Sequence, residues 1–133
     1  MVERTEGSLE EFKGEVLSVE VEENTQEDML PQYHIQIKPL DRVVVGKKGT
    51  GAMHSWIRIS GSATDSSVAR GSILERYIEI LEDLHGAVVK NMKTHAEVMK
   101  YMVGKKYLFK SKVLGKSFEK FAPASYWCPC KLL

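Results

Sequence analysis

The segment Lys105–Phe121, KKYLFKSKVLGKSFEKF, combines six lysines and four aromatic residues with a single acidic residue, Glu119. Apolar and basic residues alternate in its first half, which is typical of a β-strand with one buried face. The two faces would be formed by Tyr107, Phe109 and Val113 and, opposite them, by Lys106, Lys110 and Lys112. Leu114–Ser117 then predicts a turn into a second strand that begins at Phe118. We expect this hairpin to form the basic wall of a small β-barrel.

Charge is distributed unevenly along the chain, although the formal net charge is only +1. Residues 1–30 include ten acidic and two basic residues, whereas residues 90–133 include two acidic residues and ten lysines. Such an asymmetry favours interaction with a charged partner. The alternative is that the two ends neutralise each other, either as adjacent strands or between neighbouring protomers.

Length and composition indicate one globular domain over residues 1–133. A chain of 133 residues can bury one hydrophobic core, and 43% hydrophobic with 28% charged residues is too apolar for a disordered protein. No run of residues is long and apolar enough to span a membrane, and the acidic start lacks the features of a signal peptide. We therefore expect an intracellular, cytoplasmic protein.

Cys128 and Cys130 are the two cysteines of the chain, and one proline separates them. This spacing is not that of a thioredoxin-like redox pair, and no second pair is present to complete a zinc site. A zinc site shared with a second chain or with a distant histidine is the alternative. We expect two reduced thiols, with no metal ion and no cofactor.

The first predicted strand begins after Gly14, where a short helical turn opened by a capping box at Ser8–Glu11 would end. Val16 interrupts the alternation of apolar and polar residues beside Gly14, which indicates a bulge or bend that curves the strand. Beyond this point the apolar residues fall on one face, and they are Leu17, Val19 and Val21.

Two more strands are predicted at Tyr33–Lys38 and Met53–Ser60, joined through a basic, glycine-rich turn. On the later of these strands, His54, Trp56 and Arg58 share the face that points away from the core. A large aromatic side chain is rarely left in water without a use, so this face is a candidate binding surface. The alternative is that Trp56 packs beneath the helices.

Helices are predicted between the third and fourth strands. Ser72 and Thr94 each stand three residues before a glutamate, which is the spacing of a capping box. Gly86 and Gly104 would end the two helices. Apolar residues recur at helical spacing from 73 to 84, so one side of the first helix should pack on the core.

Three strands, a helical insert and two closing strands follow one another in an order that resembles the OB-fold. The resemblance is carried by the Gly14 bend, the Trp56 and Arg58 face, the helix from 72 to 84 and the basic hairpin, over about residues 10–127. It implies a mainly β, five-stranded Greek-key barrel with one or two helices between strands 3 and 4. The chain departs from the family in its acidic first connection and its longer helical insert.

The resemblance also implies binding of single-stranded nucleic acid, with DNA favoured, in replication, repair or recombination. Bases would stack on Trp56, and basic side chains would contact the phosphates. The residues of the implied site are Lys38, Lys47, Lys48, His54, Trp56, Arg58, Lys106, Lys110, Lys112 and Lys116.

Other classes of function stay open from the sequence. A protein–protein adaptor or homo-oligomer would dock its acidic N-terminal region on the basic hairpin of another copy. A small enzyme would need a deep pocket that gathers His34, His54 and a carboxylate, and we expect none because the four histidines are scattered along the chain. In the plainest alternative, the lysines of the hairpin only protect an edge strand against aggregation.

Overall fold

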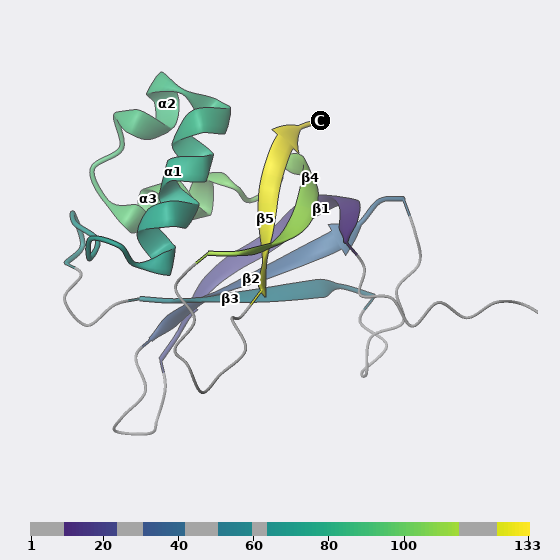
Figure 1. Cartoon of the computed structure of the whole chain (residues 1–133), viewed down its shortest axis with the longest axis horizontal. Coiled ribbons are helices and arrows are strands. Elements are labelled where there is room, and N and C mark those ends of the chain that lie inside the picture. The colour runs from purple at the N-terminus through teal and green to yellow at the C-terminus, as the bar shows by residue number, and fades with distance from the viewer. Residues whose placement is uncertain (1–9, 24–30, 42–50, 60–63, 115–124) are drawn as a thin grey trace, which may run out of the picture.

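The computed structural model describes residues 10–23, 31–41, 51–59, 64–114 and 125–133. Within them, five strands form one antiparallel sheet in the order β3-β2-β1-β4-β5 (Figure 1). The strands are β1 (Glu11–Glu22), β2 (Gln32–Pro39), β3 (Met53–Arg58), β4 (Lys106–Val113) and β5 (Ser125–Leu132). The helices between β3 and β4 are α1 (Ile73–His85), α2 (Ala87–Lys90) and α3 (His95–Tyr101). The predicted mainly β fold class with a helical insert is confirmed.

The central strand β1 pairs with two neighbours along different parts of its length. Residues 14–22 pair with β2 and residues 11–15 pair with β4, so Gly14 belongs to both ladders. The register with β2 shifts between Val16 and Ser18, which confirms the predicted irregularity beside Gly14. A single bent strand thereby holds the two halves of the sheet together.

Gly14 lies where the backbone of β1 comes close to core side chains. A Cβ atom at this position would lie 2.5 Å from Ile37 Cγ2, 2.7 Å from Phe12 Cε2 and 3.2 Å from Phe109 Cδ2. The rings of Phe12 and Phe109 stack on each other with their centroids 5.4 Å apart. The missing side chain at Gly14 therefore makes room for the ring pair that packs beside it.

The hydrophobic core lies between the sheet and the helices, which gather on one side of the strands in Figure 1. Its largest fully buried side chains are Phe12, Tyr33, Ile35, Ile37, Ile57, Leu74, Tyr77, Leu81, Met99, Met102, Tyr107 and Phe109. The Tyr77 hydroxyl donates to the carbonyl oxygen of Trp127 at 3.0 Å and so ties α1 to β5. Burial raises the pKa of Tyr77, which keeps this hydroxyl protonated as a donor.

Ser72 and Thr94 begin their helices as predicted. Ser72 Oγ accepts from the Glu75 N–H at 3.1 Å, and Thr94 Oγ1 accepts from the Glu97 N–H at 3.2 Å. Gly86 follows the last residue of α1 with a φ of 68°, as predicted for a glycine stop. The sequence did not predict α2, because four residues are too few to show a helical period. No described helix is long and apolar enough to cross a membrane.

Three expectations for β1 were wrong. The strand already begins at Glu11, inside the helical turn that was predicted to run up to Gly14; Ser8 lies outside the described residues. Leu17 and Val21 are 44% and 47% exposed instead of buried. The register shift leaves Leu17 without a cross-strand partner in β2, and Val21 is the penultimate residue of the strand.

The prediction for the end of the basic strand was also wrong. Val113 is 50% exposed, although it was expected on the buried face. The reason is that β1 begins opposite Lys110, so the end of β4 has only β5 as its neighbour. The predicted start of the next strand at Phe118 lies outside the described residues. Its described part, β5, runs through Pro129, which an edge strand tolerates because one side of it forms no ladder.

The two edge strands, β3 and β5, contact each other. Among the described residues no ladder of hydrogen bonds pairs them, and the structure is one five-stranded sheet. The closed barrel therefore stays a prediction.

Candidate functional site

Three aromatic rings, those of His34, His54 and Trp56, form a cluster on the outer face of β2 and β3. Side chains alternate along both strands, so every second residue enters the core and the residues between point away from it. In the β2–β3 ladder His34 lies opposite Trp56, and His54 lies opposite Gln36, the next outward residue of β2. Strand pairing thus brings the three rings of this ring cluster together.

The rings of the cluster lie nearly parallel to one another. The centroids of His34 and Trp56 are 4.7 Å apart at an interplanar angle of 10°, and those of His54 and Trp56 are 5.6 Å apart at 14°. Trp56 is 43% exposed, so the predicted outward position is confirmed and the alternative of packing beneath the helices is wrong. An indole this exposed offers a flat apolar surface on which another ring can stack.

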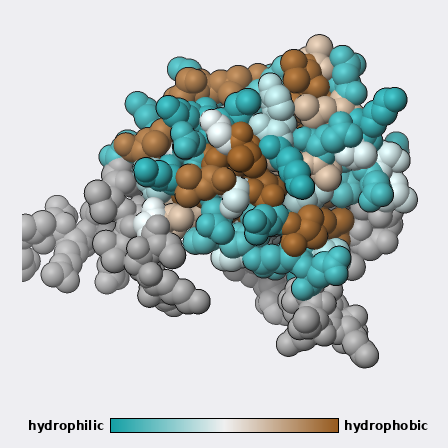
Figure 2. Space-filling view, turned by 180° about the vertical axis from the view of Figure 1, so that it is seen from behind, coloured by the Kyte–Doolittle hydropathy of each residue, from teal (hydrophilic) through white to brown (hydrophobic). Residues whose placement is uncertain are grey.

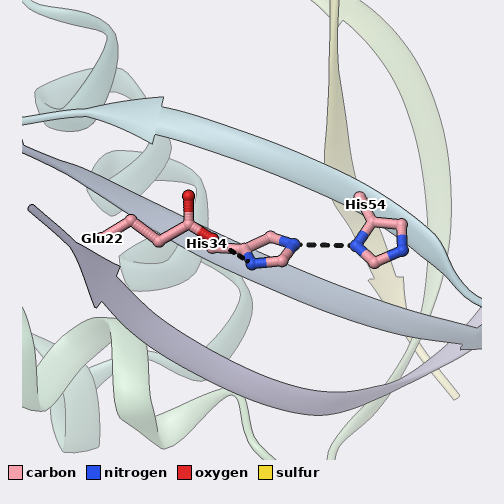
Figure 3. A network of polar contacts seen from close by, with 3 residues as sticks. All are labelled: Glu22, His34 and His54. Atoms are coloured by element: carbon pink, nitrogen blue, oxygen red, sulfur yellow. Dashed lines mark hydrogen bonds and ion pairs between the residues drawn. The ribbon is translucent and has the colours of Figure 1, made fainter. Parts of the chain in front are cut away.

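A chain of polar contacts runs from Glu22 through the two histidines of the ring cluster (Figure 3). Glu22 Oε1 lies 2.7 Å from His34 Nδ1, and His34 Nε2 lies 2.7 Å from His54 Nδ1. The second ring nitrogen of His54 lies on the far side of the ring from His34. Three neighbouring strands, β1, β2 and β3, each supply one member of this Glu22–His34–His54 chain.

Sequence analysis predicted His54 as a site residue. It considered His34 and a carboxylate beside His54 only for a deep enzyme pocket, which was not expected, and did not single out Glu22. The two histidines are 20 residues apart, and the strand pairing decides which outward side chains meet. The available signal was that Glu22, His34 and His54 all alternate with apolar residues along their strands. It becomes informative only after the register of the three strands is known.

The electrostatic surroundings keep His54 neutral at neutral pH. Desolvation by burial lowers the pKa of His54, and the neighbouring His34 lowers it further, while Glu22 acts in the opposite direction. A second carboxylate, Glu20, lies opposite His34 in the β1–β2 ladder. The β1 side of the ring cluster is therefore acidic.

A basic region lies at the opposite side, where β3 meets β5. Arg58 is exposed and shares the outward face of β3 with Trp56. Burial raises the pKa of Tyr126 in β5, and the charge of Arg58 counteracts this shift, which places Arg58 within electrostatic reach of Tyr126. Lys112 in β4 is the cross-strand partner of Tyr126. Two predicted phosphate contacts, Arg58 and Lys112, are thus related to the same tyrosine, one by its charge and the other by strand pairing.

The other described lysines of the predicted site face glutamates of β1. Lys110 Nζ lies 3.9 Å from Glu11 Oε2, and the two residues are cross-strand partners. Glu15 is the partner of Lys38 on one side and of Lys106 on the other. At these positions, acidic and basic parts of the sequence lie on adjacent strands, as one of the two interpretations of the charge asymmetry predicted.

Three predicted site residues, Lys47, Lys48 and Lys116, lie outside the described residues. The remaining seven fall into two groups. The first is formed by His54, Trp56 and Arg58 on the outward face of β3, together with Lys112 opposite Tyr126, and the second by Lys38, Lys106 and Lys110, opposite β1 glutamates.

A small cleft of roughly 130 Å³ lies elsewhere, between α1, α3 and residues 66–68. Its lining includes Lys93 and His95, but none of the predicted site residues. The Tyr33 hydroxyl contacts His95 Nδ1, and burial together with the charge of Asp65 raises the pKa of Tyr33 to about 12. This contact ties α3 to β2. His34, His54 and a carboxylate do meet, but on an open sheet face and not in this cleft.

The cysteines are free thiols, as expected. Cys128 is buried, and burial is the main cause that raises the pKa of its thiol to about 12. Among the described residues, no group of three or more histidine, cysteine, aspartate or glutamate side chains is arranged to hold a metal ion.

No protein family matches this chain, and no curated protein and no solved structure matches it.

Proposed function

We propose that this protein binds single-stranded nucleic acid on the outer face of β2 and β3. The observation that carries the proposal is the ring cluster, in which the exposed indole of Trp56 lies parallel to the imidazoles of His34 and His54. Every base has a flat face, and stacking on an exposed aromatic ring contributes about 1–3 kcal/mol per base. The bases of a single strand are free to stack in this way, whereas those of a duplex are not.

The proposal includes an OB-fold barrel. OB-folds bind oligonucleotides on the face of their second and third strands, and the ring cluster occupies the corresponding strands, β2 and β3. A central first strand that bends near Gly14 and pairs with β2 and β4 supports such a barrel. Contact between the edge strands β3 and β5 supports it as well.

Phosphates of the bound strand would lie along the contact between β3 and β5, next to Arg58 and Lys112. Lys112 is the cross-strand partner of Tyr126, and the charge of Arg58 acts on the same tyrosine. Lys38, Lys106 and Lys110 would contribute less, because cross-strand carboxylates offset their charge.

The experiment is a titration of a fluorescently labelled, single-stranded oligonucleotide with the protein, followed by anisotropy over a range of salt concentrations. Each phosphate neutralised in a single strand contributes about −0.7 to the slope of log K against log salt. We expect Arg58→Ala to weaken binding and reduce the slope by about 0.7. The matched control is Lys110→Ala, which also removes an exposed cation, but one that faces Glu11, and should change the slope less. Absence of binding even at low salt would refute the proposed function.

The adaptor or homo-oligomer is the alternative, and two observations make it less favoured. Glu11 and Lys110 pair within one chain, so their charges are less available to a second copy. The face seen in Figure 2 divides its apolar area into patches separated by polar side chains, whereas permanent interfaces have a more continuous apolar core. A stable dimer at low salt that dissociates at high salt in sedimentation would favour this alternative.

A further inference from the structure

Within the part of the protein that the structure describes, the Glu22–His34–His54 chain ends at the second ring nitrogen of His54, Nε2. We propose that these hydrogen bonds make His54 Nε2 an acceptor at neutral pH, so that it selects a ligand N–H or O–H group beside Trp56. When the two histidines together take up one proton, His54 Nε2 becomes a donor and selects a phosphate oxygen. The inference rests on the proposed function, because the ligand is the nucleotide that stacks on the ring cluster.

The acceptor state follows from the donors and acceptors along the chain. An ionised carboxylate only accepts hydrogen bonds, so the contact of Glu22 with His34 places the imidazole hydrogen of His34 on Nδ1. A neutral imidazole has one N–H, so His34 Nε2 must accept, and His54 Nδ1 must donate to it. The hydrogen of neutral His54 is then on Nδ1, and its Nε2 is left with a lone pair.

One proton taken from solvent changes His54 Nε2 from a hydrogen-bond acceptor into a donor, whichever of the two rings holds the charge. If His54 is protonated, its Nε2 carries the added hydrogen. If His34 is protonated, its Nε2 donates to His54 Nδ1, and the hydrogen of His54 moves to Nε2. A second proton would place two N–H groups against each other across the 2.7 Å contact. The pair therefore takes up one proton as a coupled unit while the contact lasts.

Some charged neighbours of the His34–His54 pair favour its protonated form, and others disfavour it. Glu22 and Glu20 on β1 favour the protonated pair, and Glu22 also contacts it directly. On β3, Arg58 lies two residues beyond Trp56 and disfavours an added positive charge. Further along β2, Lys38 lies opposite Glu15, which offsets it. The lowered pKa of His54 agrees with a neutral His54 at physiological pH.

The first test needs no nucleic acid. Nitrogen chemical shifts of the imidazoles in the free protein, measured by NMR at about pH 7.5, where an unperturbed histidine is neutral, report which nitrogen carries hydrogen. We expect hydrogen on Nδ1 of both His34 and His54. Glu22→Ala should release this preference, whereas Glu20→Ala, which removes the same charge from the same strand face, should retain it. Hydrogen on His54 Nε2 in the wild-type protein at this pH would overturn the inference.

The second test compares oligonucleotide affinity at about pH 7.5 and about pH 5.5, on either side of the ordinary histidine pKa. Because an exposed charged contact is weak, we expect the wild type to bind about two- to fivefold more tightly in acid. His54→Gln keeps a hydrogen-bonding side chain that does not titrate, and it should lose this gain.

The outcomes separate the two proposals. Binding that depends on Trp56 but has the same pH dependence in the wild type and His54→Gln would overturn the inference and leave the proposed function standing. Absence of binding at both pH values would overturn the proposed function and, with it, the assignment of a nucleotide as the ligand.

Discussion

On the helix-covered face of the sheet, histidines contact buried tyrosines, whereas on the outer face of β2 and β3 they contact each other. His85 Nε2 lies 2.7 Å from the Tyr107 hydroxyl, and this contact ties α1 to β4. His95 contacts the Tyr33 hydroxyl in the same way and ties α3 to β2. The contact between His34 and His54 joins neighbouring strands that are already paired, and it lies beside an exposed indole.

This difference indicates what each face contributes. Contacts that join a helix to the sheet across the core contribute to stability, because either partner left alone would be a buried polar group. The outer cluster adds little to the core, and its exposed ring and outward nitrogen belong to the proposed binding surface. Substitutions should therefore separate into those that change the free energy of unfolding and those that change binding.

The largest effect is expected on the core side, from Gly14→Ala. The added methyl would lie 2.5 Å from Ile37 Cγ2 and 2.7 Å from Phe12 Cε2, so core side chains must move. We expect the free energy of unfolding to fall by about 3 kcal/mol, as in other overpacked cores. Urea denaturation measures it. The adjacent exposed residue gives the control, Lys13→Ala, which should change stability by less than about 0.5 kcal/mol.

Trp56→Ala should weaken binding and leave stability nearly unchanged, the reverse of what we expect for Gly14→Ala. We expect oligonucleotide affinity to fall about 5- to 150-fold, which corresponds to the loss of one stacked base, about 1–3 kcal/mol. Stability should change little, because the side chain is already 43% exposed. Trp56→Phe keeps a ring and should retain most of the affinity. Equal binding by the wild type and Trp56→Ala would remove the ring cluster from the site.

A smaller effect on stability is expected from Tyr107→Phe. The substitution leaves the ring in the core but removes the hydroxyl that contacts His85. We expect a loss of about 1 kcal/mol in the free energy of unfolding and no change in oligonucleotide affinity. Tyr33→Phe removes the corresponding contact with His95 and should behave alike. A drop in affinity with unchanged stability would contradict the division between the two faces.

The smallest effect is a dependence of stability on pH. Burial, and then the charge of Lys105, lower the pKa of His85, and burial and His34 lower the pKa of His54. The unfolded chain therefore binds more protons than the folded protein just below the ordinary histidine pKa of about 6.5. Stability should be fully present above this value and fall as the pH drops through it. Denaturation at about pH 7.5 and about pH 5.5 should show a smaller fall for His85→Gln than for the wild type.

Local patterns in the sequence predicted much of the fold. Ser72 and Thr94 begin their helices through capping contacts that span three residues, so neighbouring residues contain all the necessary information. The outward position of Trp56 follows from alternation along one strand. Leu17 and Val113 were placed wrongly because their exposure depends on a register shift and on where a neighbouring strand begins. The candidate site was predicted in part, through His54, Trp56 and Arg58.

The sequence by itself determined the order of the strands and the two capped helices, because these features depend on residues a few positions apart. Alternation placed Trp56 on the outward face of its strand but left open whether the helices cover the indole. Only the tertiary structure decided that Glu22, His34 and His54 form one chain and that Lys110 lies opposite Glu11. Both arrangements depend on the register between strands that are distant in the chain. A shift of one residue in that register would turn every side chain to the other face of the sheet.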